Sequence, residues 1–113
     1  MSNKEEKVVA ANNDVLEIMP LVDIIDGTEG VDMWFEVPGA NSGTVDVEVR
    51  NQVMSLEARS SLRRNGRPIV FRRSFQLSDG IDVTGITAKT QDGVLSLCLP
   101  KSAAAKVYKI KVG

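Results

Sequence analysis

The chain has 113 residues, of which 42% are hydrophobic and 26% are charged, and its formal net charge is −1. This length and composition predict a single soluble globular domain. The near balance of charge excludes the overall positive field that attracts nucleic acid or an anionic membrane surface, so we expect neither as a partner.

Histidine is absent, and Cys98 is the only cysteine. The commonest general base and metal ligand are therefore missing, which argues against triad-type hydrolysis and most zinc sites. Asp23, Asp26 and Asp32 do not recur at the spacing of a metal-binding loop. We expect no enzyme activity, no catalytic residue, no metal and no cofactor.

Two features of the sequence predict a cytoplasmic protein. Charged residues stand near the amino end, where a secretory signal needs an apolar core, and no window approaches the ~18 apolar residues of a membrane span. Cys98 cannot form an internal disulfide, which agrees with a reducing compartment. It also lacks a histidine that could activate it, so we expect a packed or idle thiol.

Residues 1–19 are mostly polar, and Asn12, Asn13 and Asp14 break any long hydrophobic period. We interpret them as a flexible N-terminal arm that allows a short helical turn. The apolar residues near the end of this arm are Val15, Leu16, Ile18 and Met19.

From Pro20 the hydrophobic period changes to two, which predicts strands over residues 21–25 and 31–37. The odd-numbered residues of the second strand are apolar, whereas Trp34 lies on the polar face. Trp34 is a candidate contact residue, because tryptophan buries much area at little entropic cost. Alternatively, a terminal arm or a loop covers it.

Further strands are predicted over residues 45–49, 53–59, 71–77, 85–90, 94–99 and 106–112. The Asn65-Gly66 pair is a strong hairpin signal, and Pro100 ends a strand because it has no N–H to donate. About eight short strands joined by turns, with no convincing long helix, predict an all-β fold, an antiparallel β-sandwich.

Five short motifs follow one another along the chain. They are Glu36-Val37-Pro38-Gly39; Phe71, Arg73 and Phe75; Ala88, Gly93, Val94 and Leu95; Leu99-Pro100-Lys101; and Ile110 with Val112. Together with the strand order, they make the chain resemble the alpha-crystallin domain of the small heat-shock proteins. The resemblance implies an immunoglobulin-like sandwich that dimerises, assembles through its tail and holds unfolding proteins in solution without ATP.

The resemblance also divides the chain into three parts. Residues 1–19 are the flexible N-terminal arm, residues 20–101 the alpha-crystallin domain, and residues 102–113 a C-terminal extension with an I-x-V tail.

Ile110 and Val112 are the candidate assembly tail. They lie two residues apart in an extended stretch, so both side chains project to one side and can add a strand to an exposed sheet edge. The alternative is a last strand that pairs inside its own domain. By resemblance, the groove that receives the tail or a client is lined by Val47, Val49, Ile86, Ala88 and Thr90. These residues can equally be plain core.

By resemblance, Phe71, Arg73 and Phe75 form the dimer interface. Alternation places Arg73 on the apolar face of its strand, where a charge needs a carboxylate or an interface. Alternatively, a bulge turns Arg73 outward beside Arg72. The segment between Arg59 and Phe71 is short for a strand swap, so we expect residues 68–77 to pair edge to edge with a second copy.

These features together predict an ATP-independent holdase that binds partly unfolded client proteins as a homodimer or a larger oligomer. The alternative is an adaptor similar to the co-chaperones with a CS domain, which docks one folded partner. The short N-terminal arm favours the adaptor, whereas Arg73 and the Ile110-Val112 tail favour the chaperone.

Overall fold

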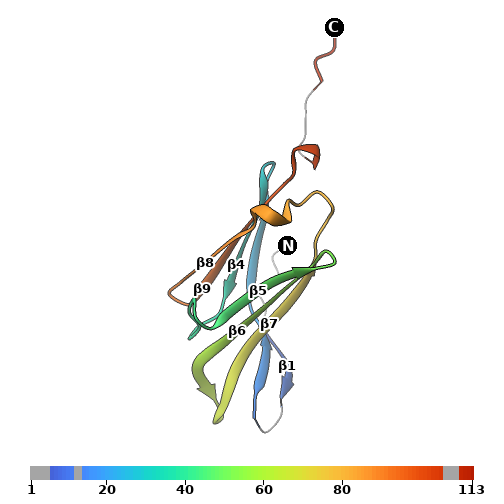
Figure 1. Cartoon of the computed structure of the whole chain (residues 1–113). Helices are drawn as coiled ribbons and strands as arrows, with labels where there is room; N and C mark the ends of the chain where they lie inside the picture. The colour runs from blue at the N-terminus through green and yellow to red at the C-terminus, as the bar shows by residue number, and fades with distance from the viewer. Residues whose placement is uncertain (1–5, 12–13, 106–109) are drawn as a thin grey trace.

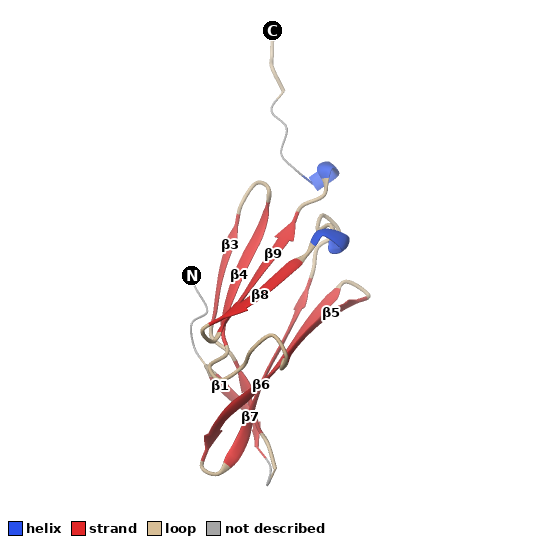
Figure 2. Ribbon diagram, turned by 60° about the vertical axis from the view of Figure 1, so that its left-hand side comes forward, coloured by secondary structure: helices blue, strands red, loops and turns tan. Residues whose placement is uncertain are grey.

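The computed structural model describes residues 6–11, 14–105 and 110–113. Within these residues, nine strands form two sheets packed as a sandwich (Figure 1). The strand order is β1-β2-β7-β6-β5 in one sheet and β3-β4-β9-β8 in the other. Figure 2 shows the two sheets from a second side. The predicted all-β sandwich is confirmed.

The strands of the first sheet are β1 (Lys7–Ala11), β2 (Leu16–Met19), β5 (Val45–Arg50), β6 (Val53–Arg64) and β7 (Arg67–Gln76). Those of the second are β3 (Val22–Asp26), β4 (Gly30–Glu36), β8 (Thr87–Gln91) and β9 (Val94–Pro100). Two short 3-10 helices, η1 (Val83–Gly85) and η2 (Ala103–Ala105), lie outside the sheets. Strand β2 pairs with β7 in parallel, whereas the other strand pairs are antiparallel.

Alternation along the central strands builds the core. In the β4–β9 pair, Met33 lies opposite Leu97 and Phe35 opposite Leu95, and all four side chains are buried. The first sheet contributes Met54, Leu56 and Ala58 from β6 to the same cluster. Because successive side chains of a strand point to opposite faces, the residues between them face outward.

The predicted hairpin at Asn65-Gly66 is confirmed, because β6 and β7 pair on either side of it. Both residues have positive φ, of 53° and 75°. Asp92 and Gly93 repeat this conformation between β8 and β9. Two successive positive φ angles define the turn whose twist matches that of antiparallel strands.

Two local expectations are wrong. The N-terminal arm forms the strands β1 and β2 of the first sheet rather than a flexible segment with a helical turn, and its Leu16 and Ile18 belong to the core with exposed fractions of 7% and 0%. The strand expected from residue 85 begins at Thr87, because the 3-10 helix η1 occupies Val83–Gly85. The strand expected over residues 106–112 lies partly outside the described residues, and residues 110–113 are not in a strand.

Candidate assembly surfaces

An open groove runs between β5 and β8, which are the edge strands of their sheets. Its volume is about 250 Å³. The groove is lined by Ser42, Val45, Val47, Ala88, Lys89, Thr90 and Leu95. The inward residues of β5 are half-buried valines, and Ala88 is small, so a further apolar side chain has room beside them.

Three of the five residues expected in this groove line it, namely Val47, Ala88 and Thr90. Val49 and Ile86 are partly buried against the core and are not among the lining residues. Strand alternation alone could not separate these two roles, because the lining depends on where the second sheet ends. Val45 and Leu95 line the groove too, and sequence reasoning missed both.

The segment at the C-terminal end carries two exposed apolar side chains. Ile110 and Val112 are 82% and 88% exposed. In Figure 1 the C-terminal end lies away from the two sheets. The chain is anchored at Lys101, whose Nζ lies 2.7 Å from the Gly27 carbonyl oxygen and 2.7 Å from the Asp26 carboxylate. A pairing of this end inside its own domain is therefore not seen for residues 110–113.

The outer edge of β7 is occupied by the chain's own β2. Leu16 pairs with Ile69, Glu17 with Val70 and Ile18 with Phe71. Phe71 is 1% exposed in this arrangement. While β2 is in place, the expected edge-to-edge pairing of residues 68–77 with a second copy is therefore blocked at Ile69, Val70 and Phe71.

Arg73 faces inward, as strand alternation indicates, and β7 has no bulge that turns it toward Arg72. Its guanidinium carbon lies 4.9 Å from the centre of the Phe75 ring, and Nη1 donates to the carbonyl oxygen of Pro20 at 3.2 Å. Burial lowers the pKa of Arg73 from its usual value. The aromatic face and the carbonyl partly replace the carboxylate that the sequence led us to expect.

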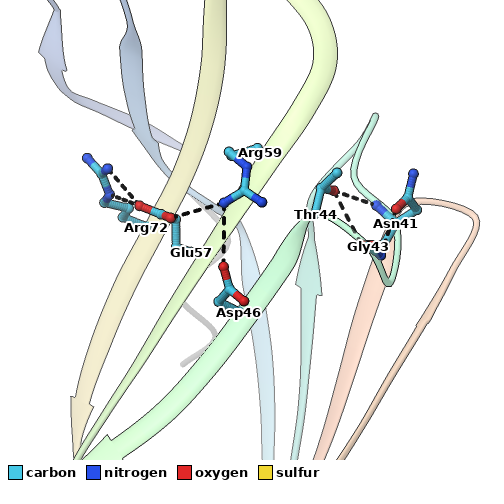
Figure 3. A network of polar contacts seen from close by, with 7 residues as sticks. All are labelled: Asn41, Gly43, Thr44, Asp46, Glu57, Arg59 and Arg72. Carbon is cyan, nitrogen blue, oxygen red and sulfur yellow. Dashed lines mark hydrogen bonds and ion pairs between the residues drawn. The ribbon is translucent and has the colours of Figure 1, made fainter.

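Ion pairs cross the outer face of the first sheet (Figure 3). Arg72 of β7 contacts Glu57 of β6 at 2.7 Å, and Arg59 lies 3.4 Å from both Glu57 and Asp46. Arg72 also contacts Glu17 of β2 at 2.6 Å. Hydrogen bonds to Glu57 and Glu17 raise the pKa of Arg72. These ion pairs thus link β2, β7, β6 and β5 through side chains of alternating charge.

The outer face of the second sheet holds Trp34, which is 37% exposed. It lines a shallow depression together with Asp32, Ser96 and Cys98. Burial and the adjacent Asp32 raise the pKa of the Cys98 thiol, so little of the reactive thiolate forms near neutral pH. In the described part of the chain, no group of three or more His, Cys, Asp or Glu residues is placed to hold a metal ion.

Among the described residues, no helix is both long and apolar enough to span a membrane.

Comparison with known proteins assigns the fold to a class. A model of the Hsp20/alpha crystallin family matches residues 23–113. The solved small heat-shock protein of Xylella fastidiosa, which has a distinct high order structure, has a TM-score of 0.66 and 28% identity over 84% of this chain and 96% of its own. The hspA structure of Xanthomonas axonopodis has a TM-score of 0.64 and 27% identity over 74% of this chain and 93% of its own. The fold is therefore that of an alpha-crystallin domain.

Among curated proteins, the 18 kDa antigen 2 of Mycobacterium avium is 32% identical over 103 residues, which cover 84% of this chain and 74% of the relative. The chain belongs to the Hsp20/alpha-crystallin family of small heat-shock proteins. Members of this family are ATP-independent chaperones of the stress response rather than enzymes.

Proposed function

We propose that this chain is a holdase, which binds partly unfolded client proteins and prevents their aggregation without ATP. The observation that supports this proposal is an apolar groove between two free strand edges, β5 and β8, in a chain whose tail exposes Ile110 and Val112. An extended apolar segment can bury its side chains there while its backbone pairs with a strand edge. Each such contact is weak, so many must act in parallel.

The proposed organisation has three parts, an arm over residues 1–19 that joins the first sheet through β1 and β2, a domain over residues 20–101 and an extension over residues 102–113. The tail of one copy occupies the groove of another, in which Val49 and Ile86 support the lining residues Val47, Ala88 and Thr90 from the core side. A dimer contact through Phe71, Arg73 and Phe75 requires β2 to move off β7, because Ile18 pairs with Phe71 there. We place this activity in the cytoplasm, where the unpaired Cys98 stays reduced.

The role of the tail in assembly can be tested by replacing its two apolar residues. An Ile110→Ser, Val112→Ser double variant should have a smaller oligomer mass, because a serine side chain offers the groove little apolar area. Mass is measured by light scattering at several protein concentrations. A Val8→Ser, Val9→Ser variant is the matched control, since these valines of β1 are also exposed, at 55% and 53%. An unchanged mass for the tail variant would contradict the proposed role of the tail.

The alternative is an adaptor that docks one folded partner. Trp34 on the open face of the second sheet is the observation that favours it, because exposed tryptophan is typical of contact surfaces. The two functions differ in an aggregation assay. Light scattering of a heated model protein should fall when a holdase is added in comparable amount, and should not change with an adaptor.

A further inference from the structure

Two short segments of this chain share the pattern apolar, charged, apolar. They are Leu16-Glu17-Ile18 and Ile110-Lys111-Val112, and their central residues have opposite charge. The first forms β2 and buries its two apolar side chains, whereas those of the second are exposed. The strand edges of β7 and β5 must therefore distinguish two segments that are similar in size and spacing.

The edge of β7 is matched to the acidic segment. Glu17 projects to the outer face of the sheet, where its Oε1 lies 2.6 Å from Nη1 of Arg72. A segment with lysine at this position would place two like charges side by side, which is unfavourable between neighbouring strands. The β7 edge thus favours Leu16-Glu17-Ile18 over the tail.

The edge of β5 has the opposite character. Val45 and Val47 line the groove, and the residues that alternate with them on the outer face are Asp46 and Glu48. These carboxylates are well exposed, at 74% and 63% of their side-chain surface. Each has a single cationic contact among the described residues, with Arg59 at 3.4 Å for Asp46 and Arg50 at 3.2 Å for Glu48.

A strand that adds to β5 with its apolar side chains in the groove presents its central residue on the outer face, beside these carboxylates. We propose that Lys111 from the tail of a second copy lies against Asp46 and Glu48, and that this charge match directs the tail to the β5–β8 groove rather than to the β7 edge. The inference rests on the proposed function, because it specifies how the tail finds the groove.

A second copy is the occupant that the geometry favours. The tail leaves the domain at Lys101, beyond the carboxyl end of β9, whereas the groove is lined by Leu95 near its other end. Six residues of strand separate these points by roughly 20 Å, so the tail, which extends at most about 30 Å from Lys101 to Ile110, would have to turn back along β9 to reach the groove of its own domain. The C-terminal end is directed away from the sheets (Figure 1), and its apolar side chains are exposed.

Reversing the charge of Lys111 tests this proposal in the full-length protein. Exposed ion pairs contribute about 0.2–1 kcal/mol each, so changing attraction into repulsion in Lys111→Glu should weaken subunit association roughly 2- to 10-fold at low salt. The difference from the unmodified chain should shrink in 0.5 M salt, because screening acts on exposed charges. Sedimentation equilibrium at both salt concentrations gives the association constants.

A compensating change identifies the partner charges. Adding Asp46→Lys and Glu48→Lys to the Lys111→Glu variant should restore association, whereas adding Glu36→Lys, on the exposed face of β4, should not. Equal association of Lys111→Glu and the unmodified chain at low salt would overturn the charge match. If the Ile110→Ser, Val112→Ser variant also associates normally, or if the unmodified chain is monomeric at every concentration, the proposed role of the tail fails as well.

Discussion

Gln52 has a backbone conformation that glycine or asparagine adopts at lower cost. Its φ is 67°, in the turn that joins β5 to β6, and it follows Asn51 at 51°. A left-handed conformation costs a residue with a Cβ about 1–2 kcal/mol, and glycine avoids this cost. Part of the gain is offset, because glycine has more conformational freedom to lose from the unfolded chain. Gln52→Gly should therefore stabilise the fold by about 0.5 kcal/mol, seen as a melting temperature higher by about 2–4 °C.

Gly66 supplies the matched control, because it has a φ of 75° and a Cβ built there meets no atom within 4 Å. Gly66→Ala should thus lower stability by about 1 kcal/mol through backbone conformation alone. Glycine keeps the backbone carbonyl of residue 52, which accepts from the Leu77 N–H and the Gln76 side-chain amide, so a melting temperature that falls in both variants would contradict the prediction for Gln52.

At the scale of elements, β1 and β2 are the strands that the sequence did not predict, and β2 is the one that contributes to the core. Leu16–Met19 has only four residues, and Asn12, Asn13 and Asp14 stand shortly before it, so the local pattern is too short to indicate a strand. Its partner β7 lies far along the chain, and a distant pairing leaves no local signal. The hairpins at Asn65-Gly66 and Asp92-Gly93 were predictable, because each turn carries its own residue signature. The groove between β5 and β8 was expected from the family resemblance, whereas its limits depend on how the two sheets meet, which no local pattern indicates.

The ion pair between Glu17 and Arg72 should hold β2 against β7. Glu17→Lys replaces attraction by repulsion and should destabilise this pairing by about 0.5–1 kcal/mol, a modest amount because Arg72 is half exposed. The buried side chains of Leu16 and Ile18 still hold β2 against β7. We therefore expect β2 to open more often by local unfolding, while the second sheet stays closed. Amide hydrogen exchange should rise at residues 16–19 and 69–71 and remain unchanged in β8 and β9. Asp79→Lys, in the loop after β7, should leave all of these rates unaltered.

For the whole molecule, the proposal gives the tail and the clients the same groove, so assembly and client binding compete. A client can therefore displace the tail only to the extent that it binds the open groove more tightly than the occupied groove. Removing residues 107–113 frees every groove and leaves the β5 and β8 edges unchanged, so the truncated chain should form smaller particles yet suppress aggregation of a heated model protein at least as well per subunit. Light scattering measures both quantities in one experiment. Smaller particles with lost suppression would instead mean that clients bind the tail or the assembled surface, and the groove would have no part in holding them.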